Sequence, residues 1–416
     1  MSAPPSRGSG RRPLRALLGE EGNRLRLVYF LYFSAAGTSL PFLAKYLKGK
    51  GFTGDEIGTV QMLPGIPALF AGVLWARVAE RIGDTVRVIG WVTAWAALCA
   101  VLLPFAATPV AVGAVLLCMG LGDRGLIPML DALSVGYVRA HPGASYSRLR
   151  MFGSLGFALL STVLGYVLDA RGNRPGDAVI PWTIAGFSVA YALAARRLAP
   201  EPVEARARGA RGDLRALLGN VRLVLLLVAC AVHWLACMPY TLWMGQFVDE
   251  LRLPPWVTGW GITAGVVAEV SVMMAFPWLA RRLSSRALLA TVFVGSAVRW
   301  GLLARTTSPA AVVALQLFHG LSYGLFWTTL VQVVTDLVPP HMRATGLALC
   351  AASVFGVGTL VGSKLIGWGH DQTGSVTGLF AIGTWIELGV ALVVFALPGH
   401  GAARAGPGGG GRPEPG

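Results

Sequence analysis

The sequence is divided into long apolar stretches, each about as long as a helix must be to cross a lipid bilayer. The bilayer core accommodates about 20 consecutive apolar residues as a helix, and backbone groups inside it must be satisfied within helices or closed barrels. These stretches lack the alternation of polar and apolar residues that barrel strands have. The sequence therefore predicts twelve helical spans, near residues 27–47, 57–76, 87–106, 109–137, 151–168, 180–196, 221–244, 256–279, 287–304, 309–335, 344–368 and 376–397.

Composition supports an all-α membrane protein over a water-soluble fold. Asp, Glu, Lys and Arg make up only 13% of the 416 residues, whereas a soluble domain has about 25%. The mean hydropathy of +0.61 agrees with this.

The basic residues report topology. A net charge of +15 would suggest a nucleic-acid partner in a soluble protein, but here the arginines gather in alternate loops. By the positive-inside rule the Arg-rich loops are cytoplasmic, which predicts a multi-pass protein of the cytoplasmic (inner) membrane with both termini inside and no nucleic-acid partner. The richer set includes the N-terminal segment, Arg77, Arg81, Arg139, the 197–219 loop, Arg281, Arg282, Arg343 and Arg404.

All five cysteines fall within the apolar spans, so no disulfide framework is indicated. Cys230 and Cys237 lie seven positions apart on one helical face, but no CxxC or His/Cys cluster accompanies them. We therefore expect packing roles, with no metal and no cofactor. The Arg-rich start precedes a long apolar run without a cleavage site, so it predicts a retained first span and not a signal peptide.

A polar, Arg-rich segment in the middle of the chain divides six spans from six. The predicted parts are a cytoplasmic N-terminal segment (1–26), an N-terminal six-helix lobe (27–196), a cytoplasmic linker (197–219), a C-terminal six-helix lobe (220–397) and a disordered tail (398–416). The halves also echo each other: WARVAERIG from Trp75 resembles WLARRLSSR from Trp278, and LGYVLDARG resembles IGWGHDQTG at almost the same offset. Such parallel repeats build two-lobed transporters, with the solute between the lobes near mid-membrane.

Charged residues inside spans are the candidate site residues, because each costs about 2.5–3.5 kcal/mol on insertion scales and so implies a partner or a water-filled cavity. Asp131 and Arg150 are either the wall of a cavity or a structural ion pair, and Asp123 with Arg124 is more simply structural. Lys364 and Glu387 are interpreted as residues that reach the lipid interface. The full set is Asp123, Arg124, Asp131, Arg150, Glu269, Arg299, His319, Lys364 and Glu387.

Glu269 lies within GVVAEVSVMM with no charge nearby on its own helix. A carboxyl group in apolar surroundings ionises reluctantly, which suits a site that binds and releases protons near neutral pH. The alternative is a hydrogen-bonded structural acid. His319 could relay protons, or it could be a packing residue. Arg299 is the nearest candidate partner for both.

Several strings resemble the major facilitator superfamily, in the branch that holds the phenylpropionate permease and, further away, the lactose permease. The resemblance runs from about residue 27 to 397 and rests on LPFLAKYLKGKGFTGDEIG, PMLDAL, RLRMFGSLGF, GVVAEV, AVRWG and LQLFHG. It implies solute binding by Asp131, Arg150 and Phe157. It also implies substrate binding and proton coupling by Glu269, Arg299 and His319.

The sequence departs from the lactose permease pattern at three implied positions. Ser322 replaces the proton-carrying acid of span ten, Gln316 replaces a lysine, and Phe355 replaces the lysine of span eleven. The loop signature between spans two and three is also altered, with Ala76 and Glu80 in place of Gly and Asp. These departures fit the phenylpropionate-like branch better than sugar transport.

The resulting hypothesis is a monomeric, proton-coupled symporter of a small organic solute such as an aromatic carboxylate. Arg150 or Arg124 would meet the anion, and Glu269 would carry the proton. The alternatives are a sugar or nucleoside symporter, an exporter of the same fold and, more distantly, a membrane-embedded enzyme. The sequence contains no metal-ligand cluster, nucleophile elbow or phosphate loop that would favour an enzyme.

Overall fold

Twelve apolar segments of helix account for the architecture of the described residues. The computed structural model describes residues 20–199, 217–339 and 342–396, and every regular element in those ranges is helical. Eleven of the segments are long and apolar enough to cross a membrane, and the twelfth, Val179–Ala195, is shorter. The prediction of an all-α membrane protein with two six-helix lobes is confirmed.

The N-terminal lobe contains six spans, the second of which is broken into three pieces. Pro64 lies in the first break and Pro67 in the short middle piece. Each proline lacks the backbone N–H that would donate a helical hydrogen bond. The elements are α2 (Glu20–Gly49), α3 (Gly54–Met62), α4 (Gly65–Ala68), α5 (Ala71–Ile82), α6 (Thr85–Leu102), η1 (Leu103–Phe105), α7 (Pro109–Ala140), α8 (Tyr146–Ala170) and α9 (Val179–Ala195).

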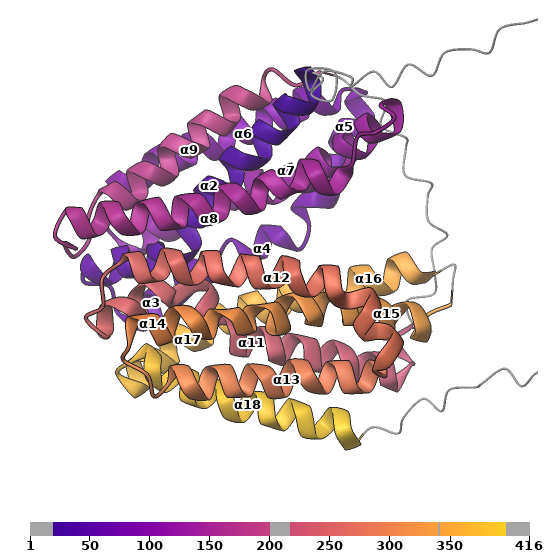
Figure 1. Cartoon of the computed structure of the whole chain (residues 1–416). Coiled ribbons are helices and arrows are strands. Elements are labelled where there is room, and N and C mark those ends of the chain that lie inside the picture. The colour runs from indigo at the N-terminus through magenta and orange to yellow at the C-terminus, as the bar shows by residue number, and fades with distance from the viewer. Residues whose placement is uncertain (1–19, 200–216, 340–341, 397–416) are drawn as a thin grey trace, which may run out of the picture.

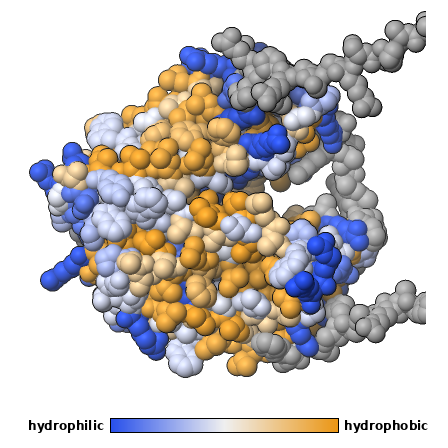
Figure 2. All heavy atoms as spheres, in the orientation of Figure 1, coloured by the Kyte–Doolittle hydropathy of each residue, from blue (hydrophilic) through white to orange (hydrophobic). Residues whose placement is uncertain are grey.

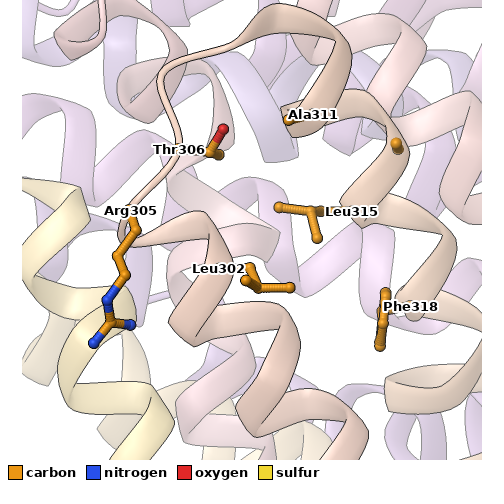
Figure 3. A pocket seen from close by; sticks show the side chains of 7 residues that line it. Leu302, Arg305, Thr306, Ala311, Leu315 and Phe318 are labelled. Carbon is orange, nitrogen blue, oxygen red and sulfur yellow. The ribbon is translucent and has the colours of Figure 1, made fainter.

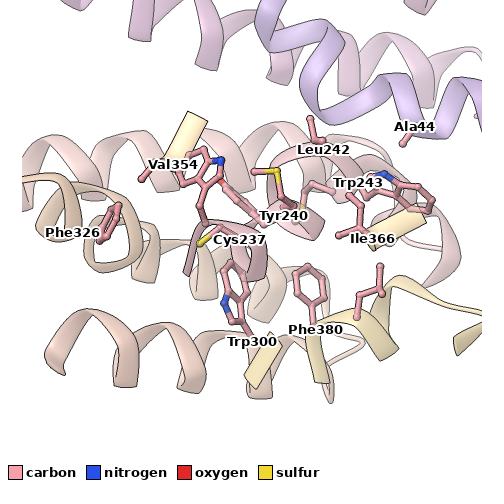
Figure 4. Packing of buried hydrophobic residues seen from close by; sticks show 14 of the residues in the cluster. Ala44, Cys237, Tyr240, Leu242, Trp243, Trp300, Phe326, Val354, Ile366 and Phe380 are labelled. Carbon is pink, nitrogen blue, oxygen red and sulfur yellow. The ribbon is translucent and has the colours of Figure 1, made fainter. Parts of the chain in front are cut away.

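The C-terminal lobe repeats this plan, with its fourth and fifth spans interrupted by π-helical turns. These turns are η3 and η5 in the following order: α11 (Val221–Glu250), α12 (Trp256–Arg282), α13 (Ser285–Leu303), α14 (Pro309–Leu315), η2 (Gln316–Phe318), η3 (Gly320–Leu325), α15 (Phe326–Leu337), α16 (Arg343–Ala351), η5 (Ala352–Gly358), α17 (Thr359–Thr373) and α18 (Val376–Ala396). Its core is rich in buried aromatic rings, including Trp243, Trp300, Phe326 and Phe380 (Figure 4).

Local signals set the helix ends. Thr53 and Glu56 form a reciprocal capping box at the start of α3. Thr108 caps α7 just ahead of Pro109, which tolerates the first helical position because its missing N–H would have no partner there. Gly374 ends α17 in the left-handed conformation, which glycine adopts without a steric penalty.

The two lobes contact each other at one end of the bundle, through α2 with α11, α3 with α17 and α8 with α12. Lys45 of α2 forms an ion pair with Asp249 of α11 at 2.5 Å. Asp371 of α17 accepts hydrogen bonds from the backbone N–H groups of Gly54 and Asp55, both at 2.7 Å. Because these amides open α3, the carboxylate caps a helix that belongs to the other lobe.

Glycines permit this close approach. A Cβ at Gly58 would come within 2.9 Å of the Gly367 Cα and 2.6 Å of the Ser363 carbonyl oxygen. Only a residue without a side chain lets α3 and α17 touch at this distance. We call the contacts of α3 with α17, together with the Lys45–Asp249 pair, the interlobe seal.

At the other end the lobes separate. Figure 1 shows them diverging toward the side where α5, α15 and α16 lie, and Figure 2 shows the surface hollowed between the two halves there. Large apolar side chains cover much of the outer surface in the same view. The exposed large apolar side chains of the whole described chain include Leu98, Leu155, Leu193, Met274, Trp385 and Leu392. Such a surface is stable in contact with lipid.

Two sequence interpretations are wrong. Glu387 does not reach the lipid interface, because its side chain is fully buried inside the C-terminal lobe. Lys364 does not snorkel either, since its ammonium group contacts Asp55 at 2.6 Å and Thr59 at 2.8 Å in the interlobe seal. The predicted tail, most of the linker and most of the N-terminal segment lie outside the described residues.

Candidate solute and proton site

The N-terminal lobe places a charged cluster on its cleft face. The Arg150 Nε of α8 lies 4.0 Å from the Asp131 Oδ1 of α7, and each side chain is about one third exposed (34% and 33%). Tyr29 of α2 donates its hydroxyl to Asp131 at 2.5 Å. The Arg150 guanidinium also stacks over the rings of Phe33 (4.3 Å) and Tyr29 (5.4 Å). The structure thus brings the predicted pair together and adds an aromatic support.

Asp123 and Arg124 point in different directions, as neighbours on a helix must. Asp123 accepts a hydrogen bond from the Tyr191 hydroxyl of α9 at 2.6 Å, within the lobe. Arg124 is exposed and lies seven positions before Asp131, which puts both on one face of α7. Asp123 therefore has a structural contact, whereas Arg124 remains a candidate for solute binding.

Phe157 lies on α8 seven positions after Arg150, so both residues share a face of that helix. Its side chain is half-buried. This is consistent with an aromatic wall beside Arg150, and its contact with solute stays a prediction.

The C-terminal lobe aligns three predicted residues in a row. The His319 Nε2 lies 3.7 Å from the Glu269 Oε2, and its Nδ1 lies 3.5 Å from the Arg299 Nη1. His319 and Glu269 are partly exposed (18% and 22%), whereas Arg299 is completely buried. Arg299 is thus screened from the cleft by its neighbours, and its direct contact with a solute stays a prediction.

The contacts fix the protonation of His319. A guanidinium can only donate, so the His319 Nδ1 facing Arg299 must be an acceptor. The ring is then neutral and carries its hydrogen on Nε2, pointing toward Glu269. A carboxylate at Glu269 can accept from that N–H, which links the acid to the buried cation behind the histidine.

Arg299 is held by the two residues that mark the departures from the lactose permease pattern. Its Nη1 donates to the Ser322 hydroxyl at 2.8 Å and its Nη2 donates to the Gln316 Oε1 at 2.5 Å. The rings of Tyr240 and Trp300 flank the guanidinium at 4.1 and 4.4 Å. The substitutions therefore build a neutral polar seat for Arg299, where the resemblance implied an acid and a lysine.

The two clusters also interact across the lobe boundary. Arg150 of the N-terminal lobe and Glu269 of the C-terminal lobe form no direct ion pair, and only a longer-range electrostatic attraction connects them. A small cavity of about 10 Å³ inside the C-terminal lobe is lined mainly by aromatic and polar side chains: Trp234, Cys237, Tyr240, Thr241, Arg299, His319, Ser322 and Tyr323. It has room for no more than about one water molecule, so a solute would have to bind in the cleft and not in this cavity.

A larger hollow than this cavity lies elsewhere. It is an open groove of about 510 Å³ between α13 and α14, lined by Leu302, Arg305, Thr306, Ala311, Ala314, Leu315 and Phe318 (Figure 3). Its lining is mostly apolar and contains none of the residues predicted from the sequence. We therefore place the candidate site at the two charged clusters and not in this groove.

Twelve helices in two lobes, with charged groups facing a cleft between them, define a secondary transporter of the major facilitator fold. The chain belongs to the MFS_1 like family, whose model matches residues 23–381. The maltose permease of Geobacillus stearothermophilus is 29% identical over 376 residues, covering 88% of this chain and 93% of the permease. The "Probable 3-phenylpropionic acid transporter" of Escherichia coli is 27% identical over 299 residues, covering 71% and 77%.

Solved structures agree on the fold. The nucleoside transporter NupG superposes with a TM-score of 0.81 at 17% identity, covering 91% of this chain and 99% of NupG. A D-xylose-proton symporter superposes with a TM-score of 0.67 at 12% identity, covering 92% and 97%. The resemblance to the major facilitator superfamily and to its phenylpropionate permease branch is confirmed.

Sequence reasoning missed several partners of the charged residues. Tyr29 carries no charge and gave no signal within its apolar span. His233 was not singled out, although it is the partner of Glu387 at 2.8 Å. A histidine in the middle of span seven was the available clue, since a buried acid needs a donor somewhere.

Proposed function

We propose that this transporter carries a small neutral, hydroxyl-bearing solute, such as a sugar or a nucleoside, together with a proton. The observation that carries the proposal is the row of groups Asp131, Arg150, Glu269, His319 and Arg299, which crosses from one lobe to the other. Arg150 is already paired with Asp131, and the buried Arg299 guanidinium donates to the neutral side chains of Ser322 and Gln316. Polar groups of this kind bind hydroxyls without needing an anion.

An aromatic carboxylate is the second candidate, and two observations favour it. Arg124 is exposed on the same face as Asp131. The Arg150 side chain also remains one third exposed beside a single acid, Asp131, so an anionic solute could approach it. The relatives include both chemistries in their names, maltose and 3-phenylpropionic acid.

Glu269 is the proposed proton carrier. Its carboxyl is deep in α12, only 22% exposed, and faces the Nε2 of His319. A protonated, neutral carboxyl can be enclosed in the occluded state of a transporter at a lower free-energy cost than a carboxylate, since an ionised group inside the membrane is expensive. Proton binding at Glu269 would therefore accompany the movement of the lobes.

The test is Glu269→Gln in proteoliposomes. The amide keeps shape and hydrogen bonding but cannot titrate, so we expect loss of uphill, gradient-driven accumulation while counterflow exchange persists within about threefold. Asp169→Asn, an exposed acid at the end of α8, is the matched control and should retain both activities. Uphill accumulation by Glu269→Gln would defeat the proposal. Loss of both activities would assign Glu269 to binding instead.

Charge movement separates the two solute classes. A neutral solute with one proton transfers a positive charge, so a membrane potential alone should drive uptake of maltose or uridine. A monocarboxylate such as 3-phenylpropionate with one proton is electroneutral and should respond to a pH gradient only. We expect potential-driven uptake. Uptake of 3-phenylpropionate alone, insensitive to potential, would favour the second candidate, and Arg124→Gln should then abolish it.

A further inference from the structure

A second acid and histidine lie entirely inside the C-terminal lobe, apart from the cleft. His233 of α11 and Glu387 of α18 are both fully buried, with the His233 Nδ1 at 2.8 and 3.0 Å from the two Glu387 oxygens. Trp300 donates its indole N–H to the same carboxyl at 3.4 Å. Phe293 and Phe326 pack on the imidazole ring at centroid distances of 5.3 and 4.5 Å. Figure 4 shows Trp300 and Phe326 in this core.

The other ring nitrogen determines where the hydrogens are. The His233 Nε2 lies 2.9 Å from the backbone carbonyl oxygen of Ser322. A carbonyl oxygen only accepts, so Nε2 carries a hydrogen. One further proton lies between Nδ1 and Glu387, and the pair is neutral overall whichever of the two holds it. This satisfies both buried groups without a net charge.

These contacts argue against a metal ion at this place. Cys237 completes a group of three potential metal ligands with His233 and Glu387. However, its Sγ lies 3.7 Å from the Nε2, whereas Glu387 faces the Nδ1. One ion cannot use two opposite nitrogens of a single ring, and both nitrogens already have partners.

Ser322 connects the buried pair to the candidate site. It lies in the π-helical turn η3, and such turns leave backbone groups without their usual helical partners. Its carbonyl accepts from His233, while its hydroxyl accepts from Arg299 at 2.8 Å. The same turn follows directly after His319, which stands between Arg299 and Glu269. The register of η3 thus decides whether the Ser322 hydroxyl and the His319 imidazole contact the Arg299 guanidinium.

We propose that His233 and Glu387 are positioning residues for Arg299: the Nε2–H of His233 holds the Ser322 carbonyl and thereby fixes η3 in the register that seats Arg299 against Ser322 and His319. Glu387 acts through His233, by setting its tautomer. The inference rests on the proposed role of the Glu269, His319 and Arg299 row, but it assigns no proton transfer to the buried pair.

The first test uses the unaltered protein, so it does not depend on whether a variant folds. In the full chain labelled with ¹⁵N-histidine, the His233 Nε2 resonance should be that of a protonated, hydrogen-bonded nitrogen. Assignment comes from single histidine replacements. An Nε2 without hydrogen on His233 would overturn the inference.

The second test compares two replacements of one residue through the ring resonances of His319. Glu387→Gln can donate its amide to Nδ1 and preserve the tautomer, so the His319 resonances should stay at their wild-type positions. Glu387→Leu cannot, and should shift them. His370→Leu removes a similar buried pair, in which His370 lies 2.8 Å from Glu250, and serves as the control that should leave His319 unmoved.

The outcomes are separable from the transport proposal. A folded Glu387→Leu protein with unshifted His319 resonances would overturn the positioning role, and so would an equal shift in the His370→Leu control. Loss of uphill accumulation in Glu387→Gln with His319 unmoved would make Glu387 a proton carrier and also overturn it. Accumulation by Glu269→Gln would remove the proton role from Glu269 and leave the resonance result intact.

Discussion

Most of the charged candidate side chains within the spans have a charged or polar partner, and the exposure left beside that partner decides which of them can respond to a solute. Asp131 is paired with Arg150 and with the Tyr29 hydroxyl, yet a third of its side chain is still exposed. Asp123, by contrast, faces Tyr191 inside the lobe. A solute hydroxyl can therefore reach Asp131 and compete for its second oxygen. Asp123 is better explained as a contact between α7 and α9.

At this scale we predict that Asp131→Asn weakens solute exchange. Asparagine still accepts from Tyr29 but no longer compensates the Arg150 charge. The loss of a charged hydrogen bond, worth roughly 1.5–3 kcal/mol, corresponds to about a tenfold to hundredfold rise in the KM for counterflow. Asp169→Asn is the control of the same chemistry. An unchanged KM would mean that the pair is only structural.

The interrupted spans carry part of the interlobe seal, through α3 and α17, and one residue of the candidate site, His319. The second span is divided into α3, α4 and α5, and the fourth span of the C-terminal lobe contains η3 between His319 and Phe326. Breaks in helices expose backbone groups that must be satisfied elsewhere. Asp371 satisfies the start of α3 from the opposite lobe, and His233 satisfies the Ser322 carbonyl of η3. Backbone groups without a partner in their own helix are thus hydrogen-bonded by side chains of other helices.

The glycine contact between α3 and α17 should be sensitive to any side chain. In Gly58→Val the added carbons would clash with the Ser363 carbonyl and the Gly367 backbone, so we expect the sealed end to open. Spin labels on Lys50→Cys and Arg252→Cys, one on each lobe, would report an increased distance. Gly90→Val is the control, because nothing lies within 4 Å of a Cβ there. An unchanged distance in Gly58→Val would show that the seal tolerates the side chain.

The whole molecule is sealed at one end and open at the other, as expected for one state of a transporter that alternates access to a site between its lobes. The seal combines the Lys45–Asp249 pair with the capping of α3 by Asp371. The candidate clusters lie on the cleft between the lobes, so closing one end and opening the other would expose them alternately. The arginine distribution predicts the orientation of the open end in the membrane.

We predict that the open end faces the cytoplasm, because the Arg-rich loops belong to that end. Reporter fusions placed after Arg208 and at the C-terminus should be active only when cytoplasmic. A reporter fused within the loop near Arg174, which lies at the sealed end, is the control and should give the opposite result. External activity of the Arg208 fusion would reverse the orientation, and the open end would then be external.

The sequence by itself determined the number and approximate bounds of the spans, their two-lobed grouping and the identity of the charged candidates. These are local properties: hydrophobic length sets a span, and the cost of a buried charge marks a residue that needs a partner. Only the tertiary structure decided which partner each one has. Glu387 meets His233, Lys364 meets Asp55, and Gln316 with Ser322 holds Arg299. The cost of desolvating a charged side chain requires that it have a partner, but the sequence does not show which residue this is. Helices that are far apart in the chain become neighbours only when they pack.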